Sequence, residues 1–216
     1  MPKLTPQAQI QRCAHILDAA ELCFARSGFH RTTMQDICRA ARVSAGAVYV
    51  YFASKEALIE GIVQRDRDSI LEKLSKVADS LDFLDGLRCI MQDCVLDQPA
   101  HKPALILEIS AEASRNPLVR RLLNDFDRTL RLTLEGLIVR AQREGRASPD
   151  IDPHAVTLVM AMLGDAMFLR RATDPDFNPA VVGPAILNVV ARLLGLNTPA
   201  LPAAERLEGR FLGAAE

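Results

Sequence analysis

The chain has 216 residues, of which 49% are hydrophobic and 25% are charged, and its net charge is −1. This composition is typical of globular proteins and excludes an intrinsically disordered or fibrous chain. The first residues lack a signal-peptide pattern, and no stretch approaches the ~18 apolar residues of a membrane span. We therefore expect a cytoplasmic protein that makes no membrane contact.

The apolar residues recur at helical spacing along the chain, which predicts an all-α protein without strands. In the first helix Ile10, Cys13, Leu17 and Phe24 share one face, and Gly28 follows where helices usually end in a left-handed residue. The predicted helices are 6–27, 33–41, 44–52, 55–78, 81–96, 103–114, 117–144, 153–173 and 179–194. The tail 197–216 is rich in Ala, Pro and Gly, which favours disorder, with a short helix over 203–211 as the alternative.

Charge is distributed unevenly along these elements. Residues 1–55 hold seven basic and three acidic side chains, a net of +4, whereas the remainder holds 19 basic and 24 acidic ones. A basic head on an acidic body favours contact between the head and a polyanion. Ordinary scatter of surface charge is the alternative, so the asymmetry alone decides nothing.

Five cysteines lie within apolar helical patterns and form no CxxC pair. We expect buried, reduced thiols, with a redox switch as the alternative. They are Cys13, Cys23, Cys38, Cys89 and Cys94.

Two short helices separated by a brief turn form the most informative pattern. Thr33 and Asp36 have the spacing of a capping box, and Ser44 has the character of an N-cap. Helix 33–41, the turn at 42–43 and helix 44–52 have the lengths of a helix-turn-helix, which presents its second helix to the DNA major groove.

The second of these helices has two unlike faces. Val48 and Phe52 are four residues apart and can pack on the body with Ile37 and Val43. The opposite face is made of small residues and tyrosines, which suits close approach to a groove wall. It comprises Ala45, Gly46, Ala47, Tyr49, Val50 and Tyr51.

These residues also carry a family resemblance. The chain resembles the N-terminal domain of the tetracycline-repressor (TetR) family over about a quarter of its length. The matching residues are Ile16–Ala20, Phe24, Gly28, Phe29, Thr32–Ile37, Val43, Ser44, Gly46, Tyr49–Phe52 and Ser54–Leu58.

The resemblance implies a fold and a function. The expected fold is an N-terminal three-helix helix-turn-helix DNA-binding domain (1–54), then a helical effector-binding and dimerisation domain (55–196) and the tail. The implied function is a transcriptional regulator, usually a repressor, that binds a palindromic operator as a homodimer and is released by a small molecule. The expected partners are double-stranded DNA, the effector and a second copy; no cofactor or metal is expected.

The resemblance also implies roles for single residues. Thr33 would give a phosphate its hydroxyl or N–H, Ser44 would act at a helix N-terminus, and Lys55 would pair with a phosphate. Tyr49, Val50 and Tyr51 would face the groove. The complete expected set is Thr33, Arg42, Ser44, Ala45, Gly46, Ala47, Tyr49, Val50, Tyr51 and Lys55.

Three positions depart from the family pattern. Position 42 is usually Gly, and Arg42 in a left-handed turn would cost about 1 kcal/mol, which a phosphate contact could offset. Position 45 is commonly long or polar and position 50 is often polar, yet here they are Ala45 and Val50. With Ala47 they suit thymine methyl groups, so we expect specificity to depend on methyl contacts and DNA shape.

Two late helices, 153–173 and 179–194, are apolar nearly all round, so each must be covered on two sides. One side can face the chain's own core and the other a second subunit. The resemblance places the dimer interface on these two helices. The expected interface residues are Val159, Met162, Ala166, Ile186, Val189, Val190 and Leu193.

Helices 81–144 could enclose an effector pocket, although ordinary core is the alternative for most of their apolar residues. Glu108 lies within an apolar run. It could pair with Arg115 or Arg131, bond a backbone group, or bind a cationic ligand. The expected effector-binding residues, for a small and largely apolar molecule, are Met91, Cys94, Glu108, Phe126, Leu130 and Phe168.

Two other classes of function compete with this reading. An enzyme is disfavoured because the histidines are scattered and no HExxH, GxGxxG, GxSxG or P-loop motif is present. A helical adaptor with a degenerate DNA-binding motif is disfavoured because Gly46, Tyr49, Tyr51 and Lys55 are retained at exposed positions.

Overall fold

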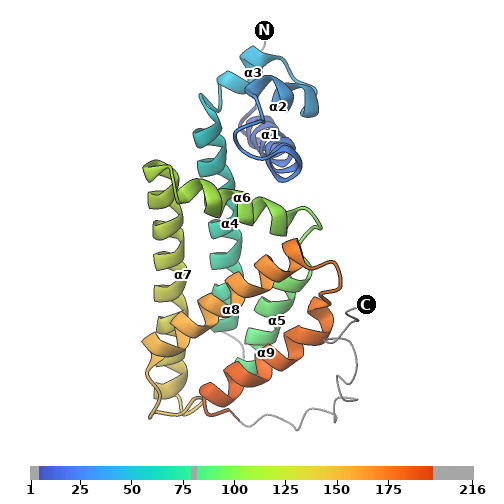
Figure 1. Ribbon diagram of the computed structural model, residues 1–216. Coiled ribbons are helices and arrows are strands. Elements are labelled where there is room, and N and C mark those ends of the chain that lie inside the picture. The colour runs from blue at the N-terminus through green and yellow to red at the C-terminus, as the bar shows by residue number, and fades with distance from the viewer. Residues whose placement is uncertain (1–4, 79–81, 197–216) are drawn as a thin grey trace, which may run out of the picture.

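The computed structural model describes residues 5–78 and 82–196, and over these ranges the chain is helical and has no strand (Figure 1). The all-α prediction is therefore confirmed. The tail 197–216 and the predicted helix start at Leu81 lie outside the described residues. The elements are α1 (Pro6–Ser27), α2 (Met34–Ala40), α3 (Ala45–Tyr49), α4 (Lys55–Ala78), α5 (Phe83–Met91), a π-helical turn (Gln92–Leu96), α6 (Lys102–Ala113), α7 (Pro117–Arg143), α8 (Pro153–Thr173) and α9 (Pro179–Leu193).

Most helix ends lie within two residues of their predicted positions, and local capping explains several of them. Asn116, Asp152 and Asn178 each accept a backbone N–H at the start of a helix whose first residue is proline. Two elements differ from prediction. Helix α3 ends at Tyr49 rather than near Phe52, and the single helix predicted over 81–96 is α5 followed by the π-helical turn.

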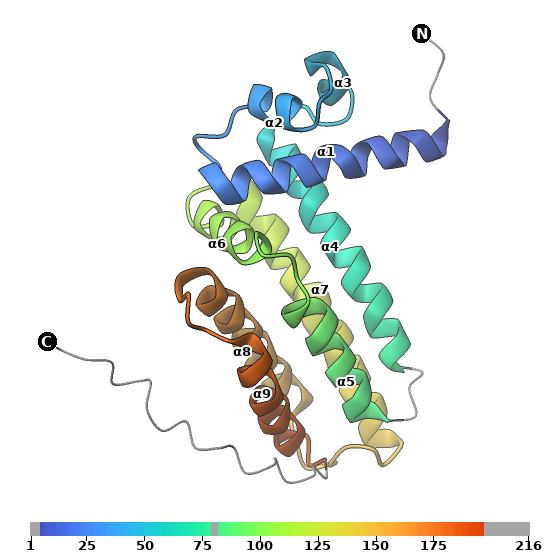
Figure 2. The ribbon, with the colours of Figure 1, turned by 90° about the vertical axis from the view of Figure 1, so that its right-hand side faces the viewer.

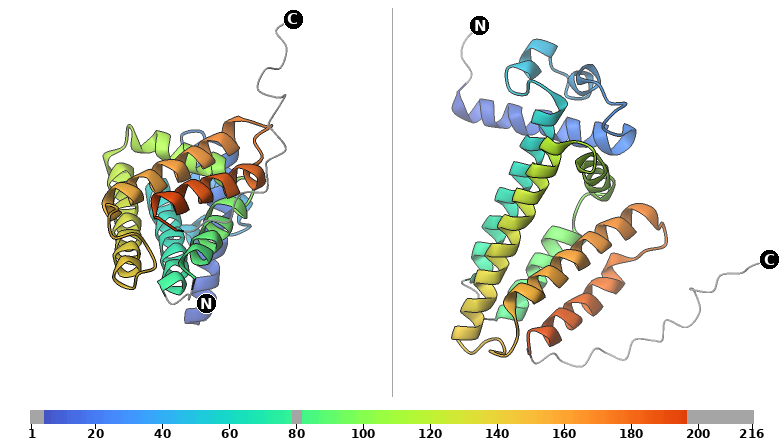
Figure 3. Two further views of the ribbon diagram at one scale, coloured as in Figure 1. Left: turned by 90° about the horizontal axis from the view of Figure 1, so that it is seen from below. Right: turned by 60° about the vertical axis from the view of Figure 1, so that its left-hand side comes forward.

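Helices α1–α3 form a head at one end of the molecule, and α4 runs from this head along α7 (Figures 1 and 3). Helix α6 lies crosswise beneath the head and contacts α1, α7 and α8; Figure 2 shows α1 above it. Helices α8 and α9 pack side by side at the far end, where α9 also contacts α5. None of the described helices is both long and apolar enough to cross a membrane.

The buried side chains form two clusters. The first joins the head to α4, α6 and the start of α7, and includes Phe24, Ile37, Leu58 and Leu105. The second lies among α5, the end of α7, α8 and α9. The head, α1–α3, and the helices after residue 54 therefore share one core. This shared core packs the head against α4 and α6.

Candidate nucleic-acid interface

Helix α2 begins with the predicted capping box. Thr33 Oγ1 accepts a hydrogen bond from Asp36 N at 3.2 Å, while Thr33 N and its hydroxyl donate to Asp36 Oδ2 at 2.9 and 2.6 Å. These hydrogen bonds from Thr33, with the nearby Arg39 guanidinium, hold the pKa of Asp36 below its ordinary value. Both Thr33 groups expected to reach a phosphate are thus engaged by Asp36, and a phosphate contact by Thr33 stays a prediction.

The turn between α2 and α3 has the expected left-handed residue. Arg42 has φ 53°, and it is the one non-glycine residue with positive φ over 5–78 and 82–196. His15 Nε2 lies 2.8 Å from Ala41 O, and since a carbonyl only accepts, this ring nitrogen carries the proton. Val43 N donates to Cys38 O at 3.1 Å. The turn is held from both sides, with the Arg42 side chain exposed.

Helix α3 has the two faces that its sequence predicts. Ser44 Oγ accepts Ala47 N at 3.3 Å, and Val48 on the inner face is fully buried with Ile37 and Phe52 around it. On the outer face Ala45 and Gly46 are exposed, Tyr49 is 53% exposed and Val50 is 77% exposed.

Two of the residues expected on this outer face are less exposed. Ala47 is half-buried, and Tyr51 is half-buried because it packs against the first core cluster. Helix α3 ends at Tyr49, and the turn after it brings part of the Tyr51 ring against the body, so a groove contact by Tyr51 stays a prediction.

Lys55, expected at a phosphate, is bonded within the chain. Its Nζ donates to Phe29 O at 2.5 Å and to His30 O at 3.4 Å, and it lies 4.3 Å from the centre of the Phe29 ring. The ammonium thereby fixes the loop between α1 and α2. A phosphate contact by Lys55 stays a prediction, and its replacement would disturb this loop as well.

A buried cluster of charges joins the head to the body, and the sequence had not indicated it. Glu21 of α1 and Lys102 of α6 are 5% and 6% exposed. Lys102 Nζ lies 2.7 Å from Glu21 Oε1 and 2.7 Å from Asp66 Oδ2 of α4. Arg65 completes the cluster, 2.8 Å from Glu21 and 2.6 Å from Asp18. The signal available in the sequence was an acid beside an apolar helix face and a lysine preceding Pro103.

The two buried carboxylates of this cluster have opposite pKa shifts. Burial disfavours the ionised form of Glu21, but Lys102, Arg65 and a hydrogen bond with His101 outweigh it and lower the pKa. Burial dominates at Asp66 and raises its pKa despite the attraction of Lys102. Glu21 is therefore the carboxylate that the site stabilises as an anion. The same residues line a cleft of about 290 Å³ between α1, α4 and the loop before α6.

A second junction lies at the other end of α6, where Glu108 meets the loop after α1. Gly28 has φ 80° and ψ 159°, a region that only glycine adopts readily. This conformation brings Phe29 N to 2.6 Å from Glu108 Oε1, to which it donates. Of the roles considered for Glu108, a bond to a backbone group is the one observed. Its expected place as an isolated polar group in an effector pocket is corrected.

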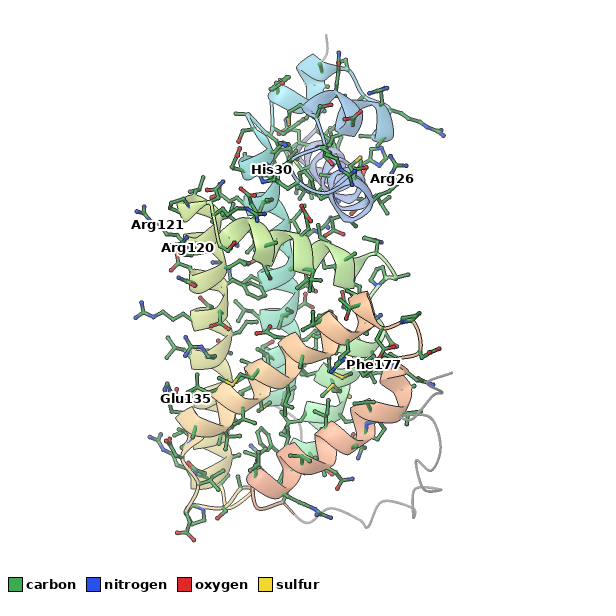
Figure 4. The ribbon with its side chains drawn as sticks, viewed as in Figure 1. Arg26, His30, Arg120, Arg121, Glu135 and Phe177 are labelled. Carbon is green, nitrogen blue, oxygen red and sulfur yellow. The ribbon has the colours of Figure 1, made fainter. Side chains whose placement is uncertain are left out.

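Glu112 adds an electrostatic contact next to this hydrogen bond. His30 Nε2 lies 3.0 Å from Glu112 Oε2, and Figure 4 shows His30 on the side of the head that faces α6. This buried carboxylate oxygen has no hydrogen bond of acceptable geometry, so the two side chains are in contact without a hydrogen bond, and they attract as an ion pair only when His30 is protonated. Helix α6 thus holds the head at Lys102 and again at Glu108 and Glu112.

Five of the seven residues expected at the dimer interface lie on the outer side of α8 and α9. Val159, Met162, Val189 and Leu193 are 38%, 67%, 51% and 39% exposed, and Ala166 is exposed as well. The other two are less exposed. Val190 is 3% exposed inside the second core cluster, and Ile186 is half-buried against that cluster. The expectation for Val190 is corrected, since its side of α9 faces the chain's own core, whereas an interface contact by the half-buried Ile186 stays a prediction.

The apolar residues expected at the effector are all half-buried. They lie on four elements: Met91 ends α5, Cys94 is in the π-helical turn, Phe126 and Leu130 are on α7, and Phe168 is on α8. Burial raises the pKa of Cys94, which does not favour a reactive thiolate. Within the described ranges, no group of three or more metal-ligating side chains is placed to hold an ion.

Known proteins are similar to this chain in sequence and in the arrangement of their helices. Residues 16–62, which span the end of α1 through the start of α4, match the family described as bacterial regulatory proteins, tetR family. The HTH-type transcriptional regulator UidR of Escherichia coli is 33% identical over 153 residues, which cover 70% of this chain and 76% of UidR.

Solved structures agree. GusR of Salmonella enterica superposes with a TM-score of 0.74 and 29% identity over 89% of this chain and 99% of its own. NalD of Pseudomonas aeruginosa, the secondary repressor of the MexAB-OprM multidrug efflux pump, has a TM-score of 0.67 and 25% identity over 86% of this chain and 97% of its own. With its helix-turn-helix head and these relatives, the chain belongs to the tetR family of DNA-binding transcriptional regulators.

Proposed function

We propose that this chain is a cytoplasmic repressor that binds a palindromic operator as a homodimer, with residues 1–54 as its DNA-binding unit and 55–196 for effector and dimer contacts. The observation that carries this proposal is the outer face of α3. It lies opposite the fully buried Val48, is left uncovered by the described chain, and stands on the basic head. NalD, with the same fold, is a repressor.

The outer face of α8 supports the homodimer. Ala155, Val159, Met162, Ala166 and Leu169 are all exposed and follow one another at intervals of four and three residues. This spacing makes a straight apolar seam of the kind that packs against another helix. Val181, Val189 and Leu193 of α9 extend the apolar surface beside it. A second copy related by a two-fold axis would cover both helices with the same two helices.

DNA binding is tested by selecting duplexes from a random library and measuring affinity across salt concentrations. We expect a palindromic site with half-sites one DNA turn apart, about 34–36 Å. The logarithm of affinity should fall linearly with the logarithm of salt, by about 0.9 for each phosphate neutralised. A salt-insensitive affinity, or selection of no sequence, contradicts the proposal.

Release by a small, largely apolar effector is the final part of the proposal. It is supported by the half-buried apolar residues of α5, α7 and α8. Phe126 packs against the first core cluster, and the others are partly shielded from solvent without belonging to either cluster. A thermal-shift screen of small molecules should find compounds that raise the melting temperature and compete with operator DNA. By linkage such compounds bind the DNA-free dimer more tightly than the bound one. If no stabilising compound competes with DNA, the effector proposal fails while DNA binding stands.

A further inference from the structure

The outer face of α3 lacks the side chains that usually read base pairs. Bidentate recognition of guanine and adenine uses Arg, Lys, Asn or Gln, and cytosine is read by Asp or Glu. None of these types occurs between Ser44 and Val50. The hydroxyls of Ser44 and Tyr49 are the polar side-chain groups of this stretch, and Ser44 Oγ already accepts Ala47 N.

Apolar groups take their place. Val50 is 77% exposed, which is more than any other large apolar side chain in the described parts of the chain, and Tyr49 beside it is 53% exposed. Exposing a branched apolar side chain to water is unfavourable, and no described neighbour covers it. This surface is therefore suited to an apolar group on the partner.

The position of Gly46 gives this surface a shape. Gly46 and Val50 are four residues apart and share the face opposite Val48, with the Val50 N–H bonded to Gly46 O. Helical side chains lean toward the N-terminus, so Val50 leans toward Gly46, although it stays more than 4 Å from a Cβ built there. A methyl group built on Gly46 would meet no atom of another described residue beyond its own helix backbone within 4 Å, so space is left open there. The result is a shallow apolar step formed by Val50 above a bare backbone.

The major-groove edges of the four base pairs carry one apolar group, the C5-methyl of thymine. Resting on the proposed function, we infer that the Val50–Gly46 step recognises a thymine methyl group in each operator half-site. Val50, the C-cap of α3, is then the specificity-determining residue of this surface, while the exposed Arg42 before α3 contributes charge without base identity.

The experiment replaces single thymines of the selected operator by deoxyuridine, which removes the methyl group and keeps the hydrogen-bonding edges. At the contacted position we expect affinity to fall about fourfold per half-site, the equilibrium factor for burying one methylene-sized group. Cytosine at that position should bind more weakly than 5-methylcytosine by about the same factor, since the restored methyl is what Val50 contacts.

A Val50→Ala variant links this effect to the residue. Val50 is exposed, so the variant should fold with an unchanged melting temperature, yet its affinities for thymine and uracil operators should agree within about twofold. Leu132→Ala is the matched control, because Leu132 is a 58% exposed side chain on α7, and it should keep the full discrimination.

The outcomes separate this inference from the proposed function. If the operator is bound specifically but no uracil substitution changes affinity beyond twofold, the inference is overturned and shape readout explains the specificity. If uracil sensitivity persists in Val50→Ala, another residue contacts the methyl and the assignment to Val50 is wrong. If no duplex is selected at all, the proposed function and the inference fall together.

Discussion

Within residues 5–78 and 82–196, apolar side chains are exposed both at α3 and along α8 and α9, and these two surfaces differ in extent and surroundings. At the end of α3 two large side chains, Tyr49 and its C-cap Val50, are exposed, and the head that carries them also has Arg39 and Arg42 exposed. On α8 exposed apolar residues continue over four helical intervals, from residue 155 to 169. A short apolar patch with basic neighbours suits a charged duplex that offers isolated methyl groups. A long apolar seam suits another helix.

The largest effect is expected when charge is placed in the α8 seam. Met162→Glu would bury an unpaired carboxylate between two copies, so we expect monomers in analytical ultracentrifugation. Operator affinity should fall by about 100-fold or more, because two half-sites are no longer bound together. Leu132→Glu, an equally exposed position on α7, should stay dimeric. A cleanly dimeric Met162→Glu protein would place the interface elsewhere.

The next largest effect is expected at the buried charge cluster of Glu21, Arg65, Asp66 and Lys102. This cluster joins the head, which carries α3, to the body, which carries α8 and α9. At pH 7 we expect Glu21→Gln to cost about 1–3 kcal/mol of unfolding free energy, because it removes charge-assisted bonds to Lys102 and Arg65. Asp66→Asn should cost less than 1 kcal/mol or stabilise the protein, since burial outweighs the pairing of this carboxylate. Urea unfolding of both variants provides the measurement.

Glu21 and Asp66 are also expected to make the stability of the protein depend on pH in opposite directions. The lowered pKa of Glu21 means that its contribution is present above the unfolded value, about 4.3, and is lost as pH falls through the folded value. The raised pKa of Asp66 means that stability is lost as pH rises from about 3.9 through its folded value. The deficit of Glu21→Gln should therefore shrink in acid. Equal deficits at pH 7 for both variants would contradict this assignment.

Gly46 tests whether the α3 surface is approached closely. Gly46→Ala should stabilise the fold by about 0.5–1 kcal/mol, because Ala is favoured in helices and its methyl has open space. Operator affinity should nevertheless fall about tenfold, since the methyl intrudes between helix and DNA. Gly136→Ala on α7, also in open space, should give the stability gain alone. Undiminished operator affinity in Gly46→Ala would argue against close contact.

Arg42 gives the smallest effect. Arg42→Gly removes a side chain from a left-handed turn and should stabilise the protein by about 1 kcal/mol in thermal unfolding. If its guanidinium neutralises a phosphate, the salt dependence of DNA binding should weaken by about 0.9 in the log–log slope. Arg42→Lys keeps the charge and should keep the slope. An unchanged slope in Arg42→Gly would mean that this side chain makes no phosphate contact.

The helices and the two unlike faces of α3 could be predicted because both rest on local signals. Caps at Thr33, Ser44 and Asn116 and the apolar spacing around Val48 involve residues only a few positions apart. The shortened α3 and the π-helical turn escaped prediction because nothing in the apolar spacing separates them from continuous α-helix.

The contacts of charged side chains could not be predicted in the same way. Glu108 bonds a backbone N–H 79 residues away, and Glu21 meets Lys102 across 81 residues, so no periodicity connects them. Which face of α9 is buried could not be predicted either. Its sequence is apolar on both faces, and only packing distinguishes the buried Val190 from the exposed Val189.

The conformation of Gly28 has a consequence for which substitutions the chain tolerates. Any other residue there would occupy a backbone region nearly closed to side chains, and its Cβ would lie 3.1 Å from Glu108 Oε1. A single replacement would thus strain the turn at residue 28 and also weaken the hydrogen bond from Phe29 N to Glu108 of α6. In a saturation mutagenesis library selected for repression, position 28 should be nearly invariant, whereas in a screen for folded protein position 46 should accept alanine. The contrast would distinguish Gly28, which the fold requires, from Gly46, which the close approach of operator DNA requires.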